Sequence, residues 1–172
     1  GQAGCGHNGT NATEAATALA AFCQVRDTLV ALQELASARR GQFGGEVLAI
    51  TGSNGKTIVK EWIHQCMGDS VRCYRSPKSY NSQVGVPLSV WGMEPEYELA
   101  LIEAGISQPG EMARLQAIIQ PDTGIFTHLG TAHQENFASL DQKLQEKAIL
   151  FRGCTKLICR SDVRVNGVQL AD

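Results

Sequence analysis

The spacing of hydrophobic residues along the chain changes repeatedly between short continuous runs and a repeat of three to four positions. Continuous apolar runs bounded by turn residues predict buried strands, and the longer repeat predicts amphipathic helices. The strands predicted in this way are residues 46–51, 71–75, 97–103, 124–127 and 156–159. Helices are predicted at residues 57–67, from Pro109 to Pro121, and after Ser139. Strands that alternate with helices predict a three-layer α/β/α fold with a mostly parallel sheet.

The segments outside these elements carry weaker patterns. Residues 1–21 contain almost no large apolar side chain, which favours a loose lead-in rather than a folded unit. Asp27 is placed to cap a helix of about three turns, whose buried face would carry Leu29, Leu32, Leu35 and Ala36. Glycines end this helix and predict a hinge, at Gly41, Gly44 and Gly45. A loop rich in Ser, Pro and Asn is expected over residues 76–87.

Length, charge and hydropathy exclude several classes of protein. A chain of 172 residues holds one domain, or one domain plus a fragment of another. A formal charge of −2 argues against a general nucleic-acid binder, and the only adjacent basic pair, Arg39-Arg40, is expected to be a solvated helix end. Without a membrane-spanning apolar stretch or a signal peptide, a cytoplasmic protein with no membrane insertion is expected.

The six cysteines are not arranged as a metal or redox site. They include no C-x-x-C pair and no histidine spacing typical of zinc. Several lie in apolar runs, as Cys159 does, so reduced and buried cysteines are expected.

Residues 51–57, Thr-Gly-Ser-Asn-Gly-Lys-Thr, carry the strongest functional signal. A tight glycine turn between a strand and a helix lets backbone N–H groups and the helix N-terminus bind phosphate, and lysine adds a cation. Thr57 would supply the hydroxyl that such loops place on Mg²⁺. The usual motif has a glycine where this chain has Ile50, and the alternative is an ordinary turn rich in small residues. The expected ATP-binding residues are Gly52, Ser53, Asn54, Gly55, Lys56 and Thr57.

Two further side chains fall at the carboxyl ends of predicted strands, where open parallel sheets bind ligands. Glu103 closes a mostly apolar strand and is a candidate ligand for the Mg²⁺ that accompanies ATP. The alternative is a charge that simply meets solvent where the strand ends. His133 follows the next strand and is a candidate for a metal or phosphate role, against the alternative of a structural histidine.

Lys147 lies on an apolar stripe of its predicted helix. The stripe consists of Leu140, Leu144, Ala148 and Phe151. Burial lowers the pKa of a lysine, and a neutral amine beside a metal site can take up CO₂ to form a carbamate. The alternative is a lysine whose stem is buried and whose ammonium group reaches water.

Taken together, these blocks resemble the Mur ligase family. The loop at 51–57 resembles the ATP-binding loop of Mur ligases, which also lack the first glycine. Blocks at 81–88, 102–105, 108–111 and 130–137 resemble the MurF branch, the UDP-N-acetylmuramoyl-tripeptide:D-alanyl-D-alanine ligases of peptidoglycan synthesis in bacterial cell walls. The resemblance covers roughly residues 27–160. Phrases at 57–62 and 104–110 look most like MurF enzymes that are fused to an alanine racemase domain.

The resemblance implies a role for each candidate residue. Lys56 would hold the ATP phosphates, and Thr57, Glu103 and His133 would hold Mg²⁺. Lys147 stands where these ligases carry a carbamylated lysine that binds a second Mg²⁺, and Asn81 lies in a loop that faces the nucleotide-sugar substrate. Lys56, Lys147 and His133 are thus the candidate catalytic residues.

The resemblance also implies a domain organisation and a reaction. Residues 1–43 would end the N-terminal UDP-sugar-binding domain, and residues 44–172 would form part of the central ATP-binding domain, a fragment inactive alone. The implied reaction activates the tripeptide carboxylate as an acyl phosphate, which the amine of D-alanyl-D-alanine then attacks. The alternatives are another ligase of this fold, of the folylpolyglutamate synthase type, and a non-catalytic nucleotide-binding module.

Overall fold

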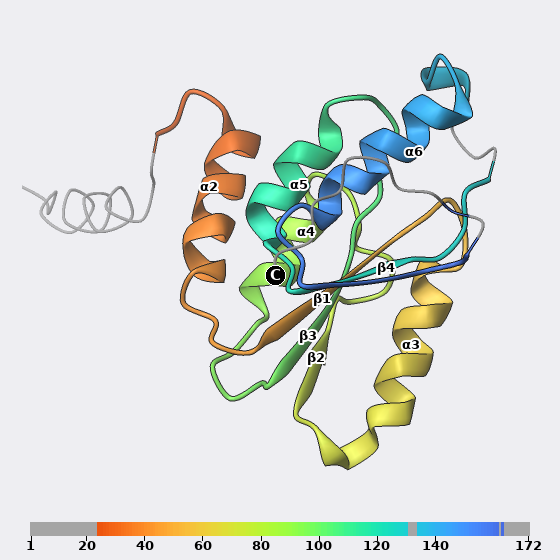
Figure 1. Cartoon of the computed structure of the whole chain (residues 1–172). Helices are drawn as coiled ribbons and strands as arrows, with labels where there is room; N and C mark the ends of the chain where they lie inside the picture. Colours follow the sequence, from red (N-terminus) through yellow and green to blue (C-terminus); the bar gives the residue numbers. More distant parts are fainter. Residues whose placement is uncertain (1–23, 131–133, 162, 164–172) are drawn as a thin grey trace, which may run out of the picture.

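The computed structural model describes residues 24–130, 134–161 and 163, and its centre is a five-stranded sheet (Figure 1). The strand order is β2-β3-β1-β4-β5, and every neighbouring pair is parallel. The strands are β1 Glu46–Thr51, β2 Cys73–Arg75, β3 Leu99–Glu103, β4 Thr123–Phe126 and β5 Lys156–Cys159. All five lie where the hydrophobic pattern predicts strands.

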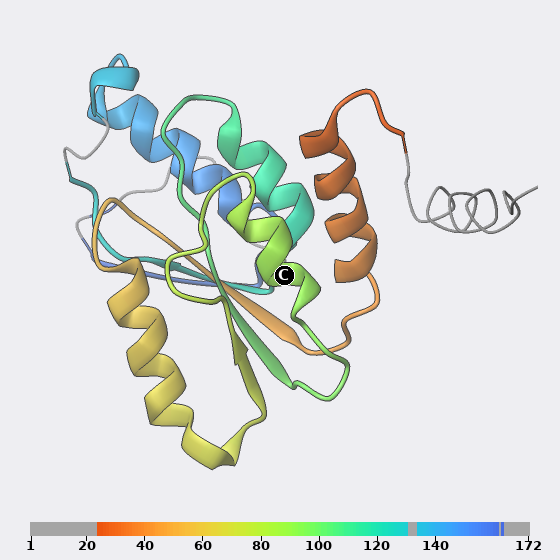
Figure 2. The same cartoon turned by 180° about the vertical axis from the view of Figure 1, so that it is seen from behind.

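Helices cover both faces of the sheet, which confirms the three-layer α/β/α fold. Helix α3 lies on one side, and the other four helices lie on the opposite side (Figures 1 and 2). The helices are α2 Thr28–Arg40, α3 Lys56–Met67, α4 Gly85–Trp91, α5 Glu111–Ile119 and α6 Leu140–Ala148. Short 3₁₀ turns are η1 Gly68–Ser70, η2 Gln134–Asn136 and η3 Ile149–Phe151. None of the helices among the described residues has the length and apolar character needed to cross a bilayer.

The strand order decides where a ligand can bind. The chain leaves β1 through α3 towards β2 on one side, whereas it leaves β3 through α5 towards β4 on the other side of β1. Connections that diverge in this way open a crevice beyond the carboxyl end of the central strand. The loops that follow β1, β3 and β4 therefore meet at one end of the sheet.

The buried core lies mainly between the sheet and the four helices on its larger side. All five residues of β3 are buried, as expected for a strand covered on both faces. Helix α5 buries one apolar face, which consists of Met112, Leu115, Ile118 and Ile119. Phe126 and Phe151 meet edge to face, with ring centroids 6.3 Å apart, and join β4 to the turn after α6.

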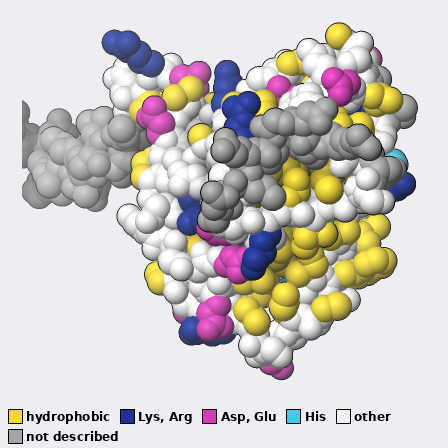
Figure 3. Space-filling view, viewed as in Figure 1, with side chains coloured by type: hydrophobic (Ala, Val, Ile, Leu, Met, Phe, Trp, Pro, Cys, Tyr) yellow, Lys and Arg dark blue, Asp and Glu magenta, His cyan; other side chains and the backbone are white. Residues whose placement is uncertain are grey.

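The opposite face of the sheet is only partly covered. On α3, Ile58 and Trp62 are exposed, and the edge strand β5 exposes Ile158. Figure 3 shows hydrophobic side chains gathered on this side of the molecule. Among the described residues α3 is the one helix on this face, which accounts for the apolar surface.

Helix α2 begins as predicted, and its buried face differs from the prediction at Leu35. The Asp27 side chain accepts hydrogen bonds from the N–H groups of Leu29 and Val30, at 2.8 and 3.0 Å, and thus caps the helix. The helix buries Gln33 and Ala36, whereas Leu35 is 56% exposed, so its predicted burial is wrong. Leu35 is rotated by about 100° around the helix from the buried Ala36.

The expectation that Arg39-Arg40 is a solvated helix end is also wrong. Arg40 donates from Nε to the Ile119 carbonyl at 2.7 Å and from Nη2 to the Gln120 carbonyl at 2.9 Å. Arg39 donates to the Met93 carbonyl at 3.0 Å. These bonds fasten the end of α2 to the loops after α4 and α5. The hinge and the domain boundary after residue 43 stay predictions.

The loop expected over residues 76–87 is wrong at its end, because α4 begins at Gly85 and includes Pro87. Pro87 is the third residue of the helix, where its missing N–H has no helical partner to lose. A proline in the first turn is therefore compatible with the helix, and the loop expected at 76–87 ends before Gly85.

The cysteines agree only in part with the expectation. Of the described cysteines, Cys66, Cys73, Cys154 and Cys159 are free thiols. Cys154 is buried, whereas Cys159 is exposed, so its predicted burial is wrong. Cys159 lies on the edge strand β5, where no further strand of the described structure covers it.

Replacement of Arg40 by alanine should destabilise the protein by roughly 2 kcal/mol, because two carbonyl groups after α5 lose a charged donor. Urea unfolding measures the loss. Arg114→Ala, which removes an exposed arginine from α5 itself, is the matched control and should cost less than about 0.5 kcal/mol. Equal stability losses in the two variants would show that Arg40 does not fasten α2.

Candidate functional site

The loop after β1 has the backbone geometry of a phosphate cradle. Gly52 and Gly55 have backbone φ angles of +146° and +83°, which residues other than glycine rarely adopt. A Cβ on Gly52 would lie 2.1 Å from Thr127 Oγ1, so only glycine fits against the loop after β4. Gly55 ends the loop as the N-cap of α3, and no side chain caps the first N–H groups of this helix. These N–H groups are therefore open to an anion.

The loop after β4 is hydrogen-bonded to the phosphate loop. Ser53 N–H donates to the His128 carbonyl at 2.7 Å, and Ser53 Oγ donates to the Gly130 carbonyl at 3.1 Å. Thr127 Oγ1 donates to the Asn54 carbonyl at 2.6 Å. The cradle is thus fixed before any ligand binds.

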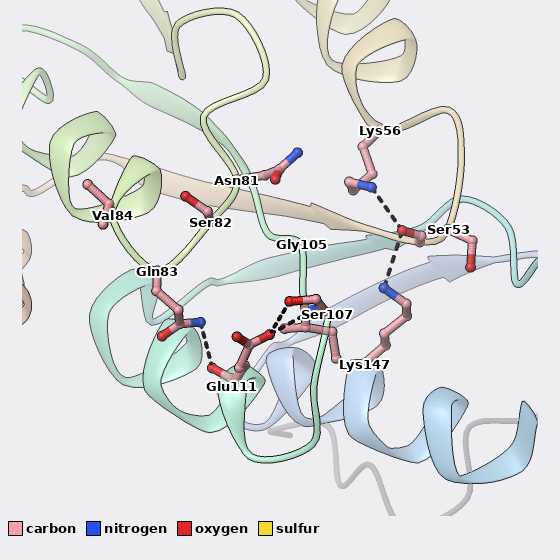
Figure 4. A pocket seen from close by; sticks show the side chains of 12 residues that line it. Ser53, Lys56, Asn81, Ser82, Gln83, Val84, Gly105, Ser107, Glu111 and Lys147 are labelled. Carbon is pink, nitrogen blue, oxygen red and sulfur yellow. Dashed lines mark hydrogen bonds between the residues drawn. The ribbon is translucent and has the colours of Figure 1, made fainter. Parts of the chain in front are cut away.

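Two lysines from distant parts of the chain converge on this loop. Lys56 Nζ and Lys147 Nζ lie 3.0 and 3.4 Å from the same acceptor, the Gly52 carbonyl (Figure 4). Burial lowers the pKa of Lys56, and the nearby Glu103 carboxylate opposes that shift. Two ammonium groups around one carbonyl form a site that favours a polyanion.

Lys147 is buried as its position on the helix predicts. Its side chain is 3% exposed, which excludes the alternative that its ammonium group reaches bulk water. Burial, followed by the charges of Lys56 and Lys143, lowers the pKa of Lys147 to about 8. The predicted stripe is wrong at one position, because Leu140, in the first turn of α6, is 45% exposed.

Glu103 is fully buried, so the alternative of a strand-end charge in solvent is wrong. Thr57 Oγ1 donates to Glu103 Oε2 across a distance of 3.0 Å. Two oxygens held about 3.0 Å apart match neighbouring ligands of an octahedral Mg²⁺ with bonds of about 2.1 Å. The predicted pair of metal ligands is thus brought together. Within the described ranges, no three His, Cys, Asp or Glu side chains cluster.

Asn81 lies beside this pair. Its Nδ2 is 3.4 Å from Glu103 Oε2, and its carbonyl accepts a 2.7 Å hydrogen bond from Gly105 N–H. His133 falls outside the described residues, so its role stays a prediction.

A cavity of about 480 Å³ opens between the phosphate loop, the 81–84 loop and the loop after β3. Figure 4 shows Lys56 and Lys147 on one side of it and Gln83 and Glu111 on the other. Gln83 Nε2 donates to the Glu111 carbonyl at 3.1 Å, and Glu111 Oε2 accepts from Ser107 N–H at 2.7 Å. The wall away from the lysines is therefore rigid and polar.

Sequence reasoning missed two buried lysines at this site. Lys60 is 0% exposed and lies 2.9 Å from Glu103 Oε1, and Lys143 is 1% exposed and donates to the Gly130 carbonyl at 2.6 Å. Lys60 lies one helical turn after Lys56, and Lys143 one turn before Lys147. This spacing places each pair of lysines on one face of its helix, but it does not by itself indicate that Lys60 and Lys143 are buried.

Comparison with known proteins agrees with this geometry. Residues 50–165 match the model of the Mur ligase middle domain. The chain belongs to the Mur ligase family. Among related Mur ligases, the UDP-N-acetylmuramoyl-tripeptide–D-alanyl-D-alanine ligase of Bacillus subtilis is 36% identical over 129 residues, 75% of this chain and 28% of that protein. The enzyme of the same name from Escherichia coli is 35% identical over the same shares. The chain thus spans less than a third of these relatives' length.

Solved structures of Mur ligases share the fold. MurF from Acinetobacter baumannii superposes with a TM-score of 0.70 at 30% identity, covering 74% of this chain and 28% of that one. MurF from Thermotoga maritima in complex with ADP gives a TM-score of 0.74 at 27% identity, covering 81% of this chain and 34% of that one. FPGS of L. casei, at 14% identity and a TM-score of 0.58, shares the fold alone.

Replacement of Lys147 by methionine should stabilise the protein at pH 7. The folded pKa of about 8 lies below the unfolded value of 10.5, so burial of the charged form costs stability in full below pH 8. This cost shrinks from pH 8 to 10.5 and vanishes above, because the amine is then neutral in both states. The gain from Lys147→Met should be roughly 3 kcal/mol below pH 8 and should fade above it.

Thermal or urea unfolding from pH 6.5 to 10.5 in bicarbonate-free buffer measures this profile. Lys156→Met, at an exposed lysine of β5, is the matched control and should be flat. A stability difference for Lys147→Met that does not vary with pH would contradict the burial argument.

Proposed function

We propose that this chain is part of an ATP-dependent amide-bond ligase that adds D-alanyl-D-alanine to UDP-N-acetylmuramoyl-tripeptide, a step of peptidoglycan precursor synthesis. The observation that carries the proposal is the set of relatives named for this reaction, at 35 to 36% identity, joined to the arrangement of Lys56, Thr57 and Glu103. The two substrates are the partners that these names supply. The cytoplasmic location stays a prediction.

The first role of the site is to hold ATP. The free N–H groups at the start of α3 and the loop glycines would bind the phosphates, and Lys56 would turn from the Gly52 carbonyl to the phosphate oxygens. Thr57 and Glu103 would hold Mg²⁺, which neutralises charge on the phosphates when bound. The ADP named in the Thermotoga maritima structure supports this assignment for the family.

The second role is to bring a carboxylate to the γ-phosphate. The cavity bordered by Asn81 and Lys147 adjoins the phosphate loop, so a tripeptide carboxylate placed there would face the end of ATP. Attack gives an acyl phosphate and ADP, and the amine of D-alanyl-D-alanine then displaces phosphate. Lys56, together with the Mg²⁺ that Thr57 and Glu103 would hold, would stabilise the negative charge shared by the two reacting groups.

Lys147 has the properties that a carbamate site needs. Its ammonium group is buried, and its lowered pKa gives a larger neutral fraction near pH 8 than an exposed lysine has. The carbamate would replace a buried cation by an anion beside Lys56 and Lys143. As the family resemblance implies, we therefore assign carbamylated Lys147 as a ligand of a second Mg²⁺. We assign His133 as a further ligand of the Mg²⁺ that Thr57 and Glu103 would hold.

Two other functions compete with this one. A ligase of the folylpolyglutamate synthase type shares the fold, but its structural likeness is at 14 to 16% identity and carries no functional weight. A nucleotide-binding module without catalysis would use the same phosphate loop. The deciding assay measures ADP release by the whole ligase. We expect release that needs both the UDP-linked tripeptide and D-alanyl-D-alanine, whereas nucleotide binding without such turnover would overturn the proposal.

In the whole ligase, Lys56→Ala should lower turnover by about 10²–10³-fold, because the cation nearest the phosphates is lost. Its stability should stay near that of the original protein, because Lys56 bonds only the Gly52 carbonyl among the described residues. Initial rates of ADP release measure the effect, and Lys156→Ala is the exposed-lysine control. Unchanged turnover in Lys56→Ala would remove the loop from the mechanism.

Lys147→Ala should lose most activity, and a short carboxylic acid such as acetate or propionate should restore part of it. The added carboxylate would occupy the space of the lost carbamate and supply the oxygen that the second metal needs. Assays at 0–200 mM carboxylate, with chloride at equal ionic strength as control, measure the rescue. Full activity in Lys147→Ala without any added acid would contradict the carbamate.

A further inference from the structure

Lys60 is a lysine with no exposed surface, in the second turn of α3. Its ammonium group donates to two backbone carbonyls, those of Ser76, at 2.7 Å, and Lys78. It also lies 2.9 Å from Glu103 Oε1 and 3.4 Å from Glu61 Oε1. A fully buried ammonium group with four oxygen neighbours is a structural centre rather than a surface charge.

The two carboxylate oxygens of Glu103 contact different groups, and Lys60 contacts Oε1. Oε1 lies against the Lys60 ammonium as an ion pair and accepts no hydrogen bond of good geometry. Oε2 faces Thr57 Oγ1 and Asn81 Nδ2. The ion pair therefore fixes the rotation of the carboxylate and leaves Oε2 as the oxygen directed at the phosphate loop.

Lys60 also holds the loop that carries Asn81. The carbonyls of Ser76 and Lys78 both belong to this loop, and Lys78 has a φ of +47°, an uncommon conformation for a residue with a side chain. The bond to Lys60 compensates for this conformation. From the held segment the chain continues to Asn81, whose carbonyl accepts the Gly105 N–H at 2.7 Å.

We propose that Lys60 is a positioning residue, which orients Glu103 Oε2 towards the metal and holds residues 76–81 against the end of β3. This role rests on the proposed function, because it concerns the same Mg²⁺ and substrate site. Lys60 lines neither cavity beside the phosphate loop, and it acts through Glu103 and the loop. Groups that orient a metal ligand in this way affect metal affinity by about 10–100-fold when they are removed.

The first experiment measures ADP binding by calorimetry in EDTA and in saturating Mg²⁺. Lys60→Met should bind ADP in EDTA within about twofold of the original protein, because the phosphate loop and Lys56 are unchanged. The gain in affinity that Mg²⁺ provides should fall at least about tenfold. A merely structural defect would lower both affinities together, and that result would overturn the proposal.

Glu61→Gln is the matched control. It removes the other carboxylate near the same ammonium group, but Glu61 is partly exposed and also pairs with Arg75 at 3.1 Å. It should leave the Mg²⁺ gain unchanged. An equal loss in Glu61→Gln and Lys60→Met would assign the effect to general charge near α3, and the positioning role would fail.

The second experiment needs no nucleotide and compares two adjacent amides by hydrogen exchange. Gly105 N–H is bound to the Asn81 loop, whereas Ala104 N–H is bound within the sheet to the Ile50 carbonyl at 2.9 Å. In Lys60→Met the Gly105 amide should exchange at least about tenfold faster, with little change at Ala104. Equal acceleration of both amides, or of neither, would contradict the proposal.

These two readouts separate the inference from the proposed function. If the original protein binds no ADP with or without Mg²⁺, the proposed function fails, and amide exchange still decides the role of Lys60. Should Lys60→Met not fold, Lys60→Gln keeps a hydrogen-bond donor at this position without the charge. Lys60→Gln should then show the same fall in the ADP affinity gained from Mg²⁺ and the same faster exchange of the Gly105 amide.

Discussion

The site depends on one constraint, which is that the Glu103 carboxylate is buried without access to solvent. A buried carboxylate is stable only beside positive charge and hydrogen-bond donors. Lys60 supplies the charge from α3, and Thr57 supplies a donor from the same helix one turn earlier. The carboxyl end of β3, the start of α3 and the Asn81 loop are therefore held in one arrangement. This arrangement places a hard oxygen ligand at the edge of the phosphate loop.

On the other side of the phosphate loop, the positive charges repel one another, whereas Lys60 is paired with Glu103. Lys56, Lys143 and Lys147 gather around the phosphate loop, and burial, followed by repulsion from the other two lysines, lowers the pKa of Lys147 to about 8. A cluster of this kind costs stability in the free protein. This cost is consistent with a binding site for anions, in which a polyphosphate ligand, an acidic substrate and a carbamate on Lys147 would balance the positive charge of the lysines. Stability and activity therefore make opposing demands on this lysine.

Much of the fold follows from hydrophobic spacing, because strands and amphipathic helices are encoded locally. β1 spans the predicted residues 46–51, and Ser139 caps α6 as predicted. Leu35 and Cys159 were misplaced because their burial depends on which neighbours cover α2 and β5, which spacing does not encode. Glu103 was found from its place at a strand end. Lys60 was not, because a lysine in a helix is normally a surface residue, and only the carboxylate and carbonyls from distant segments make its burial tolerable.

The most direct test of this account is a crystal structure with ADP and Mn²⁺, in which anomalous scattering locates the metal. The account predicts Mn²⁺ bound to Thr57 Oγ1 and Glu103 Oε2, with Lys60 still paired to Oε1 and Lys56 turned towards the phosphates. A metal that lies away from Glu103, or a Glu103 that ligates through Oε1 after leaving Lys60, would contradict it.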